Sequence, residues 1–127
     1  RTNSNIDPVG FMQMRLANGG LILNAGTGGA APVITANIRF GTGVTAQEGL
    51  VWVSGGQTGD STLYGDIEAL DFTKAGAGTL ALTAVNNYTG TTTVAASGGT
   101  LEVAGSGSLS STSSVTESMS PMIMSGV

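Results

Sequence analysis

The sequence predicts an all-β fold, and specifically a right-handed parallel β-helix, a solenoid whose coils are roughly 20–30 residues long. Three observations favour this fold. Glycine accounts for 21 of the 127 residues, while only 5% are aromatic. The apolar segments are short and are separated by Gly- and Asn-rich breaks, as in tightly turned β-structure. A leucine-led phrase also recurs at a spacing typical of solenoids.

Each expected strand is a short run of alternating or β-branched residues between turn-forming residues. No stretch of a dozen residues shows a clean helical period. The sequence therefore predicts strands, in chain order, at 11–16, 21–23, 33–40, 49–53, 63–64, 67–72, 78–83, 91–94 and 99–103.

The recurring phrase is a small residue followed by Leu-x-Leu or Leu-x-Val. Its leading residues are Leu21, Leu50, Leu80 and Leu101, spaced by 29, 30 and 21 residues, and Trp52 breaks the pattern in the second copy. In a solenoid, aliphatic residues of one coil stack on their equivalents in the next, so few large side chains are needed. The alternative is a β-sandwich, because some strand spacings also fit hairpin-linked strands.

Composition excludes several classes of function. With only four Lys and Arg residues the chain cannot form a basic patch, so we expect no nucleic-acid partner. The absence of His and Cys removes the usual transition-metal ligands, His-dependent catalysis and disulfides. No apolar run approaches the ~18 residues of a membrane helix. The first residue is Arg1 and no signal peptide is visible, which we expect of a mature chain or a fragment.

Two short motifs suggest ligand binding, and both are weak. Residues 41–46 fit the dinucleotide fingerprint G-x-G-x-x-A, but a strand and not a helix is expected after them. Residues 55–63 partly resemble a calcium-binding nonapeptide, with Asp60 and Asp66 as weak candidate ligands. We expect Gly-rich corners and solvated loop acids instead, and therefore no cofactor and no metal.

The segment 70–103 carries a longer pattern. It contains, in order, Lys-x-Gly-x-Gly-Thr-Leu from Lys74, Asn-x-Tyr-Thr-Gly from Asn86, Thr-x-Val ending at Val94 and Gly-Thr-Leu from Gly99. This segment strongly resembles the autotransporter-associated β-strand repeat, over about a quarter of the chain. The resemblance is specific, because nearly every element of that repeat is present in order.

The resemblance implies parallel β-helix coils in the passenger region of a secreted or surface protein of Gram-negative or related bacteria. Such repeats serve as stalks, adhesins or fibres, and they carry no catalytic residues. The resemblance implies tight backbone at two glycines, core leucines, a turn, and a tyrosine that caps apolar surface. These structural positions are Gly76, Gly78, Leu80, Leu82, Asn87, Tyr88, Gly90 and Leu101.

The sequence divides into a polar N-terminal arm (1–10), β-helix coils (11–104) and a C-terminal segment (105–127). The last segment begins as a Gly/Ser-rich linker and ends as a Met-rich strand or tail. An apolar strand at an open end of a solenoid can pair with another subunit. The candidate assembly residues are Met119, Met122, Ile123 and Met124.

The function expected from the sequence is that of an extracellular structural repeat protein, a surface fibre, stalk or adhesin shaft that self-associates end to end. Its further partner would be an outer-membrane translocator if the chain is part of a longer one. The alternative is a module that binds a host protein or glycan through the loops 24–32 and 54–61. A β-helical carbohydrate-active enzyme is a distant third, and we expect no enzymatic activity.

Overall fold

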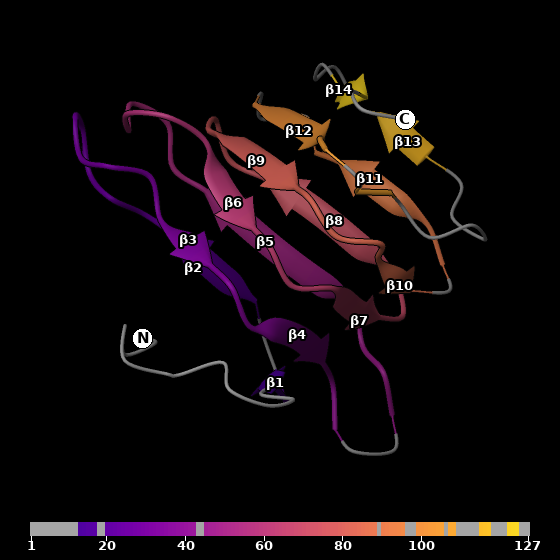
Figure 1. Ribbon diagram of the computed structural model, residues 1–127. Coiled ribbons are helices and arrows are strands. Elements are labelled where there is room, and N and C mark those ends of the chain that lie inside the picture. The colour runs from indigo at the N-terminus through magenta and orange to yellow at the C-terminus, as the bar shows by residue number, and fades with distance from the viewer. Residues whose placement is uncertain are drawn as a thin grey trace.

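The protein is a β-solenoid of about four turns, built from three parallel sheets (Figure 1). The computed structural model describes residues 13–17, 20–42, 45–88, 90–95, 99–105, 107–108, 115–117 and 122–124. The N-terminal arm 1–10 and Met119 lie outside the described residues. Strands stack from one end of the solenoid to the other, so β1 and β14 lie at opposite ends of the stack.

Each of the first four coils contributes one strand to each sheet. Sheet 1 contains β1 (Gln13–Leu16), β4 (Asn37–Phe40), β7 (Ile67–Ala69) and β10 (Asn87–Tyr88). Sheet 2 contains β2 (Leu21–Leu23), β5 (Gly49–Val53), β8 (Phe72–Ala75), β11 (Thr92–Val94) and β13 (Val115–Glu117). Sheet 3 contains β3 (Val33–Ile34), β6 (Ser61–Leu63), β9 (Thr79–Leu82), β12 (Thr100–Val103) and β14 (Met122–Met124).

The parallel register confirms the predicted solenoid. Partner residues on adjacent coils are separated by as few as 19 residues, between Glu68 and Asn87, and by as many as 30, between Leu21 and Val51. All pairs between the named strands are parallel, whereas a β-sandwich requires antiparallel neighbours. The sandwich alternative is therefore wrong.

Two of the predicted strands are in fact pairs of strands. The segment 33–40 divides into β3 and β4, with a corner at Thr35 and Ala36, and 67–72 runs from β7 through a corner into β8. A three-sided coil must turn three times within each circuit. At these places it turns at ordinary residues, so no Gly or Pro signal marks the corner.

The recurring leucine motif predicted the correct fold, but two of its four copies do not pair with each other as the motif implied. Leu80 and Leu101 are register partners in sheet 3, as expected. Leu21 instead pairs with Val51 in sheet 2, and Leu50 lies on the outer face of that sheet. The first two copies of the phrase therefore belong to a different sheet from the last two, and they differ from each other by one residue in register.

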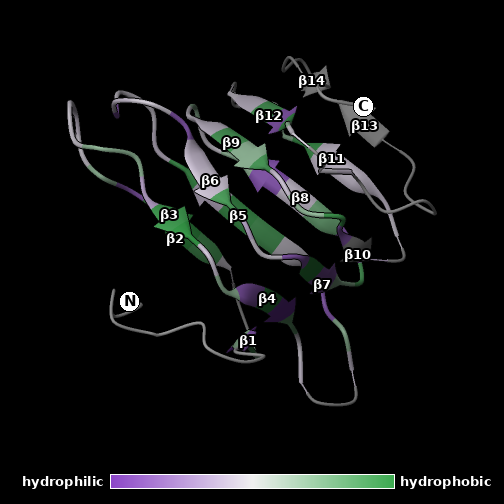
Figure 2. Ribbon diagram, viewed as in Figure 1, coloured by the Kyte–Doolittle hydropathy of each residue, from purple (hydrophilic) through white to green (hydrophobic). Residues whose placement is uncertain are grey.

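The core fills the space inside the three sheets, because strands alternate buried and more exposed residues. Figure 2 shows apolar segments in successive coils of the stack. The expectation of a core with few large side chains needs correction, because Phe40, Phe72 and Tyr88 are fully buried. Gly49 makes room for the first of these rings, since a Cβ there would lie 2.7 Å from Phe40 Cδ2.

The loops within 24–32 and 54–61 stack on one another, the second of them ending where β6 begins at Ser61. The Gly28 amide donates to the Gly56 carbonyl at 2.8 Å, and the Thr58 amide donates to the Gly29 carbonyl at the same distance. The loops thus extend the coil-to-coil pairing beyond the sheets, and they project on the same side in Figure 1. Within the described part of the chain, no helix is long and apolar enough to cross a membrane.

Candidate functional site

A lysine lies inside the coil at the start of the segment 70–103. Lys74 follows Phe72 by two residues on β8, so both side chains point inward, and Lys74 is fully buried. Its ammonium donates to the Gly76 carbonyl at 2.6 Å and also to the Gly78 carbonyl. Burial removes the ammonium from water and so lowers the pKa of Lys74 to about 8. The sequence pattern contained this lysine, but the alternation with Phe72 was the signal that could have placed it inside.

The predicted glycines form the corner that receives this ammonium. Gly76 has φ +82°, and a Cβ there would lie 2.2 Å from the Val53 carbonyl oxygen of the preceding coil. A Cβ on Gly78 would lie equally close to the Ser54 carbonyl oxygen. Gly99, one coil further on, has φ +88° and passes so close that a Cβ would lie 2.2 Å from Lys74 Nζ. Successive coils can therefore stack at this corner only as glycine backbone.

Tyr88 belongs to the core of the same segment. It is fully buried, and its ring stacks on Phe72 with centroids 5.7 Å apart. Its hydroxyl shares a hydrogen bond with Thr92 Oγ1 at 2.5 Å. The ring thus joins coil 4 to coil 3 through an aromatic contact, and the hydroxyl has a polar partner inside the core, as a buried tyrosine requires.

Two polar side chains, which the sequence analysis did not single out, tie neighbouring coils together at other corners. Asn86 Oδ1 accepts from the Ile67 amide at 3.0 Å, while its Nδ2 donates to the Ser108 carbonyl at 2.9 Å. Asp71 Oδ1 accepts from the Thr91 amide at 2.8 Å. These side chains satisfy backbone groups that the strand ladders leave unpaired at the corners.

The remaining predicted positions fall within the same two coils. Leu80, Leu82 and Leu101 are buried in sheet 3. Asn87 begins β10, and Gly90 lies in the corner after that strand, where a Cβ would collide with the Asp71 carboxylate. The structure therefore brings the predicted repeat positions together as packing and corner residues of coils 3 and 4. Met122, Ile123 and Met124 form β14 at the C-terminal end of sheet 3.

The residues of the two short motifs lie mostly in the connections between strands. Asp60 precedes β6 and Asp66 precedes β7, and no group of three acidic side chains that could hold a metal ion occurs in the described part of the chain. Gly41 and Ala46 form an isolated antiparallel bridge, and the strand β5 follows. The described residues of the fingerprint therefore lead into a strand, whereas a pyrophosphate site needs a helix N-terminus at this place.

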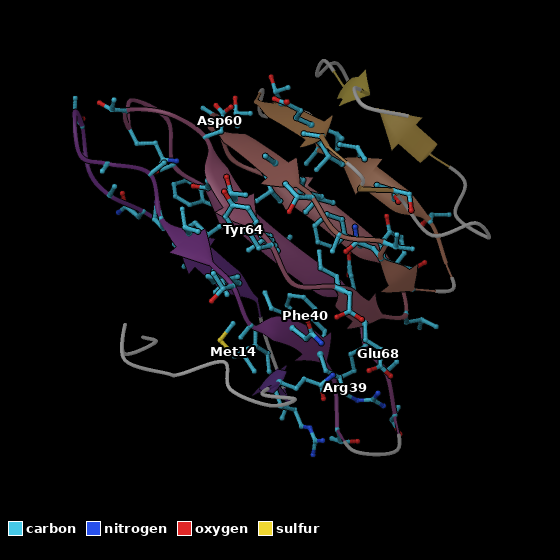
Figure 3. The ribbon with its side chains drawn as sticks, viewed as in Figure 1. Met14, Arg39, Phe40, Asp60, Tyr64 and Glu68 are labelled. Atoms are coloured by element: carbon cyan, nitrogen blue, oxygen red, sulfur yellow. The ribbon has the colours of Figure 1, made fainter. Side chains whose placement is uncertain are left out.

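The outer faces of the sheets differ in character. Sheet 1 carries an ion pair between Arg39 and Glu68 on adjacent coils (Figure 3), and Gln13 Nε2 donates to the same carboxylate at 3.3 Å. Sheet 2 instead exposes Ile22, Leu50 and Trp52, which line an open cavity of about 450 Å³ with Gly20 and Leu21. The outer surface therefore offers one polar and one apolar face in the first coils.

Comparison with known proteins identifies the segment built around Lys74. Residues 72–103 match the family model of the passenger-associated-transport-repeat. The match covers coils 3 and 4 from β8 to β12, which includes the lysine corner and the Phe72–Tyr88 pair. Comparisons with curated proteins and with solved structures give no match.

Proposed function

We propose that the chain is a structural segment of a secreted or cell-surface passenger of the autotransporter type, and that it acts as a shaft. The observation that carries this proposal is the match of residues 72–103 to a passenger-associated repeat, in a segment that forms five consecutive strands of the solenoid, β8 to β12. The proposed role requires no catalysis. An outer-membrane translocator, in the same longer chain, is the partner that this role implies.

The packing supports a mechanical role. Each coil adds about 4.8 Å along the axis through continuous backbone pairing. Residues of the repeat pattern hold the coils together: the ammonium of Lys74 binds corner carbonyls, Tyr88 joins two coils, and glycines allow the backbones to approach closely. Such a segment resists bending because every coil is bonded to its neighbours on three sides.

The test is surface display of the chain fused to an autotransporter translocator, with an epitope tag at its N-terminus. We expect tagged, protease-resistant protein on intact cells, measured by flow cytometry before and after trypsin. Gly78→Val should lose this resistance, because its side chain would collide with the Ser54 carbonyl. Gly59→Asn is the matched control, since that glycine has φ +81° and open space around it. Retention of the wild-type chain inside the cell would contradict the proposal.

One observation favours a second candidate function, in which the segment binds a host protein or glycan. The cavity on sheet 2 has a size typical of small ligand sites, and Trp52, the only tryptophan of the chain, is 40% exposed on its wall. A titration with the members of a glycan library, in which the fluorescence of Trp52 reports binding, tests this second function. If no glycan changes the emission of the folded protein, this second function fails.

A further inference from the structure

The connection between sheets 2 and 3 is long in coil 2 and short in coil 3. Two pairs of register partners bound it in these coils: Trp52 with Ala75, and Ser61 with Leu80. Between these pairs coil 2 has eight residues (53–60) and coil 3 has only four (76–79). The loop of coil 2 therefore projects past the backbone of coil 3. Described strands of coils 1 and 4 flank both coils, so this overhang lies inside the stack and not at one of its ends.

The projecting loop is paired along the edge that faces coil 1. The Gly56 carbonyl accepts a hydrogen bond from the Gly28 amide at 2.8 Å. The Thr58 amide donates to the Gly29 carbonyl at 2.8 Å, and the Thr58 carbonyl accepts from the Ala31 amide at 3.0 Å. Coil 1 thus covers this edge as one strand covers another in a parallel sheet.

The opposite edge of the loop has three backbone groups that point away from coil 1. In a trans peptide the N–H points opposite to the preceding C=O, and no cis bond occurs in the described chain. Because Gly56 and Thr58 bond to coil 1, the N–H and C=O of Gln57 and the N–H of Gly59 must point the other way. No described residue forms a hydrogen bond with these three groups, which we call the free edge. Gly59 is exposed, and a Cβ built on it would meet nothing within 4 Å.

The free edge is held in place from within the loop. The Ser54 hydroxyl donates to Gln57 Oε1 at 3.3 Å, and Gln57 Nε2 donates to Ser61 Oγ at 2.6 Å. The side chain of Gln57 thus closes the base of the loop, where both serines are buried. A backbone edge that is already fixed loses less conformational entropy when a partner binds.

We propose that the free edge binds an extended, basic segment of another protein, which adds to the loop of coil 2 as a parallel strand. The chemistry that recognises such an edge is polypeptide backbone, because its C=O and N–H groups alternate at the same spacing. The parallel direction continues the existing bridge between Ala30 and Thr58. This inference goes beyond the shaft function and does not depend on it, since a shaft requires only pairing between its own coils.

Asp60 determines the charge of the expected partner. It is the only charged residue in the ranges 24–32 and 54–61. It is exposed and lies three residues after Gln57, just before β6 (Figure 3). In a parallel strand, the residue three positions after the one opposite Gln57 comes next to this carboxylate. A lysine or arginine at that place would complement its charge.

A capped, fluorescein-labelled peptide, Val-Thr-Val-Thr-Val-Lys, tests the edge by fluorescence anisotropy with the purified protein. With its third residue opposite Gln57, the second residue accepts from the Gln57 N–H. The fourth residue donates to the Gln57 C=O and accepts from the Gly59 N–H. N-methylation of the fourth residue removes that donor and should weaken binding about fivefold or more. N-methylation of the third residue, whose N–H points away from the edge, is the matched control and should leave the affinity unchanged.

Charge reversal tests the basic character of the partner. Asp60→Lys should weaken binding of the lysine peptide about two- to fivefold, and a peptide that ends in glutamate should recover the loss. Glu48→Lys makes the same charge change at an exposed residue of the same coil, before β5, and should leave binding unchanged. Circular dichroism checks that both variants keep the fold.

Three results would overturn the inference: no saturable binding at millimolar peptide, equal binding of the two methylated peptides, or equal effects of Asp60→Lys and Glu48→Lys. Sedimentation velocity tests the other candidate occupant, a second copy of the chain. Growth of the protein beyond its 12.5 kDa monomer that the peptide abolishes would assign the free edge to self-association and overturn a foreign partner. All of these measurements use purified protein, so they leave the outcome of surface display unaffected.

Discussion

The buried ammonium of Lys74 predicts an unusual dependence of stability on pH. Burial lowers its pKa from 10.5 to about 8 in the folded protein. Between these two values the unfolded chain binds more protons than the folded one, so the free energy of unfolding must rise with pH. At about 1.4 kcal/mol for each unit of pKa, the full rise is about 3 kcal/mol, and most of it falls between pH 7 and pH 10.

The perturbation that isolates this effect is Lys74→Met, which keeps an unbranched side chain in the core without the charge. At neutral pH the variant loses two hydrogen bonds to the corner carbonyls but also avoids burying a charge, so we expect its stability to be close to that of wild type. Near pH 10 the wild-type amine is neutral and still donates to the carbonyls. The variant should then be less stable than wild type by about 2–3 kcal/mol.

Urea unfolding followed by the fluorescence of Trp52 measures both proteins from pH 7 to pH 10. Trp52 is a suitable probe because a Cβ on Gly76 would lie 3.0 Å from its ring, so the indole covers the same corner. The difference between the two proteins removes the titration of all other groups, which both share. A difference in unfolding free energy that does not change with pH, to within about 0.5 kcal/mol, would refute the burial argument.

Two further predictions concern the same coils. Tyr88→Phe removes the hydroxyl that forms a hydrogen bond with Thr92 inside the core, and it should lower the free energy of unfolding in urea by about 1–2 kcal/mol. The control Tyr64→Phe, on the surface, should change this free energy by less than about 0.5 kcal/mol. Equal effects of the two variants would contradict the role assigned to the buried hydroxyl. Gly99→Ala should lower the melting temperature more than Gly59→Ala. Both residues have positive φ, which costs about 1–2 kcal/mol for alanine. Only at Gly99 would the new Cβ also collide with the buried ammonium of Lys74. An equal drop in melting temperature for both variants would therefore argue against a tightly packed corner.

Local patterns correctly predicted several elements. The strands 21–23 and 49–53 occur at their predicted bounds, because a short apolar run between turn-forming residues is typical of a strand. Gly76 and Gly78 lie at a corner with tight backbone packing, as the repeat pattern implied, because glycine is the residue that allows such a close approach of two backbones. The segment 33–40 was predicted as one strand because its corner contains neither Gly nor Pro.

The lysine corner shows why the rest required the tertiary structure. A lysine in a sequence is normally assigned to the surface, since burying its charge is costly. Only the folded coil shows that two carbonyls turn inward to meet the ammonium, and that a glycine of the next coil leaves room for it. Similarly, Asn86 looks like any turn residue until its partners from three corners are brought together.

The sequence by itself determined the solenoid class, the repeat between residues 70 and 103 and most strand positions, because these depend on period, on small residues and on contacts within one coil. The tertiary structure decided which sheet each strand joins and that Leu21, and not Gly20, pairs with Val51. The physical reason is that register is a property of two coils together. A register shift of one residue moves every core-facing side chain of a strand to the surface and every surface side chain to the core. Only packing against the neighbouring coil selects the correct register.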